Sequence, residues 1–133
     1  MLVITSKSPY ALRALSELAR RGDAAPVPIG DLARARDIPA QFLEGLFATL
    51  RRAGILQSQR GVKGGYSFAR QPSEVTVLEV VELLEGELGT EAAANGPIWT
   101  DATDAVRAVL AGTTIADVIE QETRAAGAAM YHI

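Results

Sequence analysis

The segment that decides the fold is Pro39–Tyr66, which reads PAQFLEGLFATLRRAGILQSQRGVKGGY. Four apolar residues in it recur at the spacing of one helix face: Leu43, Leu46, Phe47 and Leu50. Gly54 then follows as a residue that commonly ends a helix. Residues 55–60 and 66–70 fit two β-strands, and the glycine-rich residues 61–65 lie between them. A helix followed by a basic β-hairpin is therefore predicted.

Two further helices are predicted upstream. Ser8-Pro9 is a good helix opening, because serine can cap and proline loses nothing at the first helical position, and this helix ends at Gly22. A second, short helix runs from Ile29 to about Arg36, and Asp37-Ile38-Pro39 separates it from the next one. Two short helices joined by a tight turn are typical of a helix-turn-helix, and the hairpin that follows is typical of a wing.

The chain after Gln71-Pro72 is predicted to be helical as well. Thr76 and Glu79 form a capping box, residues 86–97 have no periodicity and are predicted to be a loop, and a helix resumes at Ile98. A final short helix is expected to fray after Arg124. The predicted fold is mainly α with a small β-hairpin (α+β), comprising a winged helix-turn-helix domain in residues 1–72 and a helical dimerisation or regulatory region in residues 73–133.

Charge is distributed unevenly along the chain. Residues 1–71 hold eleven basic and five acidic residues, whereas residues 72–133 hold two basic and eleven acidic ones. The two parts therefore carry formal charges of +6 and −9, although the whole chain carries only −3. This asymmetry indicates either a polyanion-binding half joined to a half with other partners, or two solvated surfaces of opposite sign.

The predicted helix at 39–53 turns a polar face outward. Gln41 and Glu44 lie near its start, where a recognition helix meets base edges, and glutamine suits adenine while glutamate can accept from cytosine. Arg51 and Arg52 lie further along and suit phosphates. The alternative is a solvated amphipathic helix of another α+β domain.

The loop after this helix does not fit a nucleotide-binding enzyme. A P-loop needs its lysine followed by serine or threonine at a helix start, and Lys63 is followed by Gly64-Gly65 and a strand. Arg60 at the root of such a loop suits a narrow A·T-rich minor groove. A purely structural hairpin is the alternative.

One apolar stripe lies outside the predicted DNA-binding half, and its members are Trp99, Ala102, Val106, Val109 and Leu110. It predicts either a monomer's internal core or a self-complementary dimer contact, and the dimer contact would match palindromic half-sites.

Catalytic and metal-binding groups are scarce. The chain has no cysteine and one histidine, His132, near its end. Glu79, Glu82 and Glu85 follow helical spacing and are expected to form a solvated face. We therefore predict no enzyme, no metal site and no disulfide. Because neither a signal-peptide pattern nor a long apolar run is present, we expect a cytoplasmic protein without membrane contact.

Several motifs resemble those of the Rrf-type winged helix-turn-helix transcription regulators, the family of IscR, NsrR and CymR. The resemblance covers about residues 2–120. Its motifs are Thr5-Ser6-Lys7-x-x-Tyr10-Ala11-Leu12-Arg13-Ala14-Leu15, Ile29-x-Asp31-Leu32-Ala33, Phe42-Leu43-Glu44-x-Leu46-Phe47-x-x-Leu50-Arg51-x-x-Gly54-Ile55-Leu56, Arg60-Gly61-x-x-Gly64-Gly65-Tyr66, Thr76-Val77-x-Glu79-Val80, and Ile98-Trp99 through Thr114-Ile115-x-Asp117-Val118.

The resemblance implies a homodimeric regulator of double-stranded DNA, most often a repressor, whose long helix with Trp99 mediates dimerisation. It places the residues around Gln41, Phe42 and Glu44 in the major groove, where Gly45 departs from the polar residue of some members. It places Arg60, Gly61 and Val62 at the minor groove. The DNA-binding residues we predict are Lys7, Tyr10, Gln41, Phe42, Glu44, Arg51, Arg52, Arg60, Gly61, Val62 and Lys63.

Several members of that family hold an iron–sulfur cluster through three cysteines before the long helix. The chain lacks all three, so it resembles the cluster-free members, some of which respond to a partner protein. We expect no cofactor; no small-molecule effector can be named. An alternative function is a winged-helix interaction module that has lost specific DNA binding and docks a protein.

Overall fold

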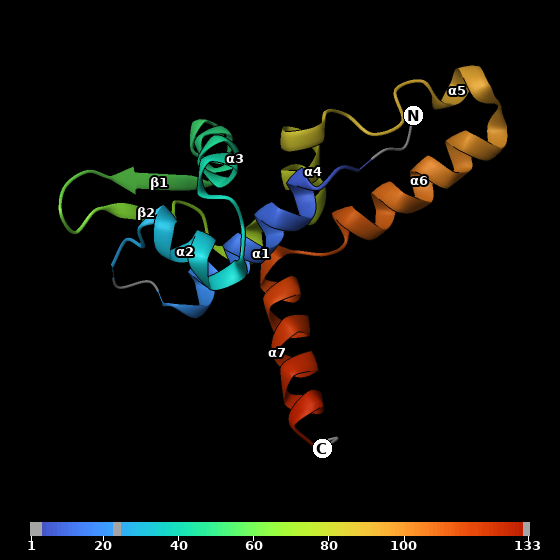
Figure 1. Cartoon of the computed structure of the whole chain (residues 1–133). Helices are drawn as coiled ribbons and strands as arrows, with labels where there is room; N and C mark the ends of the chain where they lie inside the picture. The colour runs from blue at the N-terminus through green and yellow to red at the C-terminus, as the bar shows by residue number, and fades with distance from the viewer. Residues whose placement is uncertain (1–3, 23–24, 132–133) are drawn as a thin grey trace.

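The computed structural model describes residues 4–22 and 25–131. Along the chain the elements are α1 (Lys7–Arg20), α2 (Ile29–Arg36), α3 (Ala40–Arg52), β1 (Leu56–Gln59), β2 (Gly65–Phe68), the 3-10 turn η1 (Pro72–Glu74), α4 (Val77–Glu85), α5 (Ala92–Asn95), α6 (Pro97–Ala111) and α7 (Ile115–Tyr131). Helices α1 to α3 and the hairpin form one body, from which α6 and α7 project in different directions (Figure 1). The predicted class, mainly α with one hairpin, is confirmed.

Helix α1 is the centre of the hydrophobic core. It packs against α2, α3, α4 and α7, and Leu15 on its inner face is fully buried. Phe47 of α3 and Ile115 of α7 belong to the same core cluster. Residues on both sides of Pro72 thus share one core, and the predicted domain boundary there stays a prediction.

A left-handed residue makes the turn between α2 and α3. Asp37 has φ 54° and follows α2 directly, and the amide of Ile38 donates to the carbonyl of Ala33 at 2.9 Å. Ile38 is buried, so its side chain holds the turn against the core. Pro39 comes immediately before α3, where its fixed φ suits a helix start. The predicted helix–turn–helix is confirmed.

The hairpin is fixed to the body at its base. Strands β1 and β2 pair antiparallel from Leu56 opposite Phe68 to Gln59 opposite Gly65. Val27 and Tyr66 exchange two backbone hydrogen bonds of 2.9 and 2.8 Å, which adds a bridge beside β2. A Cβ on Gly65 would lie 2.3 Å from the Val27 backbone, so only glycine fits here. The bridge therefore sets the direction of the hairpin.

The predicted opening of α1 was wrong. The helix begins at Lys7, and neither Ser8 nor Pro9 is its cap. Ser8 is buried instead, and its hydroxyl donates to Glu85 Oε2 at 2.7 Å. A hydroxyl with a carboxylate partner elsewhere in the fold does not serve the helix as a local cap.

Three predictions for the second half of the chain were also incomplete or wrong. Thr76 accepts from the amide of Glu79 as predicted, but the Glu79 carboxylate binds Arg70 instead of reaching back. The predicted loop at 86–97 contains the short helix α5. Helix α7 continues to Tyr131 instead of fraying after Arg124, which agrees with the high helix propensity of its alanines.

Candidate nucleic-acid interface

Helix α3 presents one buried and one exposed face. The predicted apolar stripe is buried as expected: Leu43, Leu46, Phe47 and Leu50. Gln41, Glu44 and Gly45 are exposed near the start of the helix, and Arg51 and Arg52 are exposed at its end. Polar groups that could meet base edges thus precede cations that could meet phosphates, in the predicted order.

An aromatic contact joins the starts of α1 and α3. The rings of Tyr10 and Phe42 pack edge to face with centroids 5.7 Å apart, and both side chains are half-buried. The guanidinium of Arg13 lies 4.7 Å from the centre of the Tyr10 ring. Lys7, one turn before Tyr10, is exposed. The contact therefore fixes α1 beside the start of α3, where Gln41 and Glu44 are exposed.

The hairpin tip is exposed and tightly turned. Arg60, Gly61, Val62 and Lys63 are all exposed, and Val62 is fully so. Gly61 has φ 111°, and its carbonyl accepts from the amide of Gly64 at 3.0 Å. This turn directs a small basic and apolar tip away from the body (Figure 1).

The hairpin also packs directly on α3. Tyr66 of β2 lies edge to face on Phe47 of α3, with ring centroids 5.2 Å apart. Because Phe47 is fully buried, α3 and the hairpin are positioned by the same core residue. The relative positions of α3 and the hairpin are consequently fixed before any partner binds.

Five arginines of the basic half are bound to carboxylates, and we call them the paired cations. They are Arg20, Arg21, Arg34, Arg36 and Arg70. Arg36 is central, since it binds Glu17 of α1 at 2.9 Å and also Glu122 of α7. Its hydrogen bond to Glu122 raises the pKa of Arg36. Burial raises the pKa of Glu17, but hydrogen bonds from Arg36 and Arg21 outweigh burial and bring it below its ordinary value.

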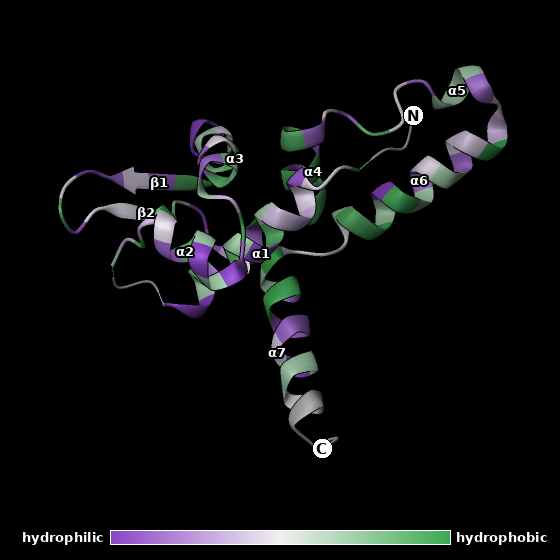
Figure 2. Ribbon diagram, in the orientation of Figure 1, coloured by the Kyte–Doolittle hydropathy of each residue, from purple (hydrophilic) through white to green (hydrophobic). Residues whose placement is uncertain are grey.

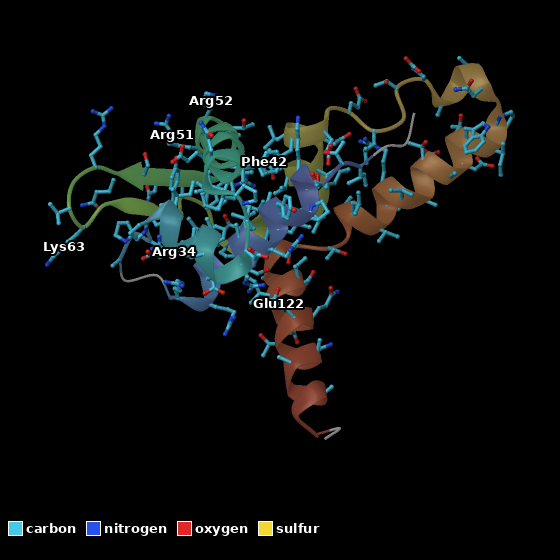
Figure 3. The ribbon with its side chains drawn as sticks, in the orientation of Figure 1. Arg34, Phe42, Arg51, Arg52, Lys63 and Glu122 are labelled. Carbon is cyan, nitrogen blue, oxygen red and sulfur yellow. The ribbon has the colours of Figure 1, made fainter. Side chains whose placement is uncertain are left out.

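Another group of basic side chains has no carboxylate within salt-bridge distance among residues 4–22 and 25–131. We call them the open cations: Lys7, Arg13, Arg51, Arg52, Arg60 and Lys63. Figure 3 shows Arg51 and Arg52 pointing outward from α3 and Lys63 at the hairpin tip, whereas Glu122 lies on α7 near the body. Five of the six open cations were predicted as DNA-binding residues, and Arg13 was not.

Glu85 was expected on a solvated face, and that expectation was wrong. Its carboxylate accepts from the hydroxyls of Thr5 and Ser8 at 2.7 Å each and from both backbone amides. Burial raises the pKa of Glu85, but these hydrogen bonds outweigh it, so that the pKa lies below its ordinary value. Glu85 at the end of α4 thereby accepts the amide of Ser8 in the first turn of α1, where Ser6 makes no side-chain cap hydrogen bond.

The other two acids of that row are bound too. Glu79 binds Arg70 at 2.6 Å, and Glu82 binds Arg107 of α6. No local pattern indicates these partners, which lie 9 and 25 residues away.

The predicted dimerisation stripe of α6 divides into two parts. Val106 and Leu110 are half-buried and pack against the core of their own chain. Trp99 and Val109 remain exposed, at 55% and 67%, and Ala102 is half-exposed. Figure 2 shows hydrophobic residues at both ends of α6, including the end that projects from the body. The stripe therefore has an apolar part that the described residues of its own chain leave exposed.

A known family matches most of this arrangement. Residues 4–121 fit the Rrf2 family model, described as "Iron-dependent Transcriptional regulator". The chain belongs to the Rrf2 family. The predicted resemblance is confirmed.

Individual Rrf2 relatives agree with this assignment. CymR of Bacillus subtilis, an HTH-type transcriptional regulator, is 30% identical across 98% of this chain and 99% of its own. Its solved structure superposes with a TM-score of 0.79 at 32% identity, covering 91% of this chain and 98% of that one. The solved IscR of T. potens has a TM-score of 0.80 at 31% identity and covers 93% and 90%. An HTH-type regulator of Synechocystis is 40% identical over 85 residues, which make up 64% of this chain but only 58% of that relative.

These findings make the chain a DNA-binding transcription regulator of the Rrf2 family. The prediction that it is not an enzyme is confirmed, because the relatives and the structural neighbours are transcriptional regulators. Within residues 4–22 and 25–131, no helix is long and apolar enough to cross a membrane.

The iron in the family description does not fit the residues of this chain. An iron–sulfur cluster is normally held by thiolates, and the chain has no cysteine. Within the described part of the chain, no three acidic or histidine side chains lie together as a metal site would require. His132, the one histidine, lies outside the described residues.

Proposed function

We propose that this Rrf2 protein is a transcriptional repressor that binds a palindromic operator as a homodimer. The observation that carries the proposal is the separation of the two groups of cations. Carboxylates neutralise Arg20, Arg21 and Arg36 at the ends of α1 and α2. Arg51, Arg60 and Lys63 keep an open charge on α3 and the hairpin. Open cations are the ones that can replace the counterions of a phosphate backbone.

The arrangement supports a specific docking. The start of α3 would enter the major groove, with Gln41 and Glu44 at base edges and Phe42 held in place by Tyr10. Arg51 and Arg52 would contact phosphates, as would Lys7 at the start of α1. The hairpin tip with Arg60, Gly61, Val62 and Lys63 would lie at the adjacent minor groove.

Dimerisation through α6 would cover the exposed part of its stripe. A two-fold contact pairs the same patch on both subunits, and exposed Trp99 and Val109 supply an apolar patch with Ala102 between them. We expect Trp99→Asp with Val109→Asp to give a monomer in analytical ultracentrifugation. Val62→Asp is the control, because it makes the same substitution as Val109→Asp at an exposed valine outside α6. A double variant that stays dimeric would place the interface elsewhere.

Selection from randomised duplex DNA at two salt concentrations tests the whole proposal. We expect a palindrome whose half-sites lie on one face of the duplex, and affinity that falls steeply as salt rises. Weak binding without sequence preference at both concentrations would contradict the proposal and favour the interaction-module alternative.

That alternative has less support than the charge of the second half suggests. Glu79, Glu82 and Glu122 are already bound to arginines of the same chain, so fewer carboxylates are open to a basic partner. We also propose that the repressor works without an iron–sulfur cluster, since it has no cysteine ligands. Its signal would then come from a different ligand or from a regulatory protein.

A further inference from the structure

Gly45 is an unexpected residue in the middle of α3. Glycine is less favourable in a helix interior than every residue except proline, because it loses the most backbone freedom on folding. A Cβ added to Gly45 would meet no atom within 4 Å, and its φ is not in the left-handed region. The described part of the chain therefore gives no internal reason for glycine at this position.

Gly45 lies on the face of α3 that points away from the core. On a helix of about 3.6 residues per turn, Gln41, Gly45 and Arg52 line up opposite the buried stripe. Gly45 is exposed, and so are Gln41 and Arg52 on either side of it. It is thus at the centre of the surface that the proposed function places in the major groove.

The neighbouring side chains leave the space above Gly45 open. The Thr49 hydroxyl donates to the carbonyl of Gly45 at 3.2 Å, and Arg52 Nη2 donates to that hydroxyl at 3.3 Å. Both side chains are therefore held along the helix. Something outside the chain can approach the backbone closely at this point.

We propose that Gly45 is a specificity-determining residue whose α-carbon packs against the C5-methyl group of an operator thymine. This inference rests on the proposed function and names one base contact within it. A residue without a side chain offers no side-chain hydrogen bond, and the thymine methyl is the apolar group that base edges present in the major groove. Glycine allows the close backbone approach that such packing needs.

The test changes one methyl-sized group on each partner separately. The operator found by selection is made with each thymine of a half-site replaced in turn by uracil, which lacks only the methyl group. We expect one position at which uracil weakens wild-type binding several-fold, because the apolar contact is lost. Gly45→Ala should bind the thymine operator about tenfold more weakly, and uracil at that same position should restore most of the loss.

Gly127→Ala is the matched control. Gly127 lies inside α7, and an added Cβ there also meets no atom within 4 Å. Both alanine variants should melt at a higher temperature than the wild type, which separates a binding defect from a folding defect. Only Gly45→Ala should change operator affinity.

Two results would overturn the inference and leave the proposed function intact. One is Gly45→Ala binding the selected operator as tightly as the wild type. The other is a loss of affinity that is the same on thymine and uracil operators at every position. A wild type that selects no operator would instead contradict the proposed function, and this inference with it.

Discussion

The open and the paired cations belong to the same basic half of the chain, yet they have different roles. Two of the paired cations tie elements together: Arg36 joins α2 to α1 and α7, and Arg70 joins the chain after β2 to α4. The other three each bind a carboxylate three or four residues away along the same helix. The open cations lie in the first half of α1, on α3 and on the hairpin, and bind no carboxylate among the described residues. The net charge of a segment therefore overstates the charge available to a partner, because a carboxylate bound to an arginine cancels most of its field.

The largest expected effect comes from the centre of the paired group. Arg36→Ala should lower the free energy of unfolding by about 3 kcal/mol, because Arg36 is only 16% exposed and its loss leaves two carboxylates without their shared partner. Urea unfolding of the wild type and the variant measures this. Operator affinity of the folded variant should stay unchanged.

Arg36→Met distinguishes the lost charge from lost packing. Methionine keeps an apolar stem of similar length, so it should recover part of the stability if packing of the arginine stem matters. If the fully folded Arg36→Ala variant binds the operator more weakly than the wild type, the paired cations also contribute to DNA binding and the two groups are not functionally separate.

Arg60→Ala should produce the converse result. It removes an open cation from the exposed hairpin tip, so we expect an operator affinity lower by about 1–3 kcal/mol, with the largest loss at A·T-rich flanks. The free energy of unfolding should change by less than about 0.5 kcal/mol, since Arg60 has no partner among the described residues. Fluorescence anisotropy on operators with A·T-rich and G·C-rich flanks measures the difference. An equal loss of affinity on the A·T-rich and G·C-rich operators would show that Arg60 does not bind in the minor groove.

Glu85 extends the comparison to a carboxylate that binds no cation among residues 4–22 and 25–131. Its pKa is lowered in the folded protein, so its stabilising effect is present above the ordinary glutamate pKa and is lost as the pH falls through the lowered value. Glu85→Gln should cost about 1 kcal/mol near neutral pH, because an amide accepts fewer of the hydrogen bonds from Thr5 and Ser8. The variant should also show a shallower loss of stability in acid.

Unfolding of both proteins in urea from neutral to acidic pH tests this. Glu17 also has a lowered pKa, so a residual acid dependence is expected in the variant. Parallel curves for the two proteins would show that Glu85 does not contribute to the acid sensitivity.

Local patterns in the sequence predicted most of the basic half of the chain, apart from the opening of α1. The apolar stripe of α3, the turn at Asp37 and the hairpin depend on neighbours within a few residues, so periodicity and turn chemistry indicate them. The outward positions of Gln41, Glu44 and Arg60 follow from the same patterns and were predicted correctly as exposed.

Partners that are distant in the chain could not be predicted this way. Glu85 binds Ser8 across 77 residues, and Arg36 binds Glu122 across 86. Such pairs depend on how α1, α4 and α7 pack, and a charge at helical spacing has the same pattern whether it is solvated or bound. The division into open and paired cations therefore depends on the fold and cannot be predicted from the composition of the chain.

The smallest expected effect compares one exposed arginine from each group. Arg34 is paired with Asp31 at the surface and Arg51 is open, and both belong to helices of the helix-turn-helix. Arg51→Ala should reduce the slope of log affinity against log salt by about one, because one phosphate contact is lost. Arg34→Ala should leave the slope unchanged and cost less than about 0.5 kcal/mol of stability, since exposed pairs contribute little. Equal slopes in the two variants would mean that the carboxylate beside Arg34 does not keep it from the DNA, and that position on the surface, rather than pairing, decides which cations bind phosphate.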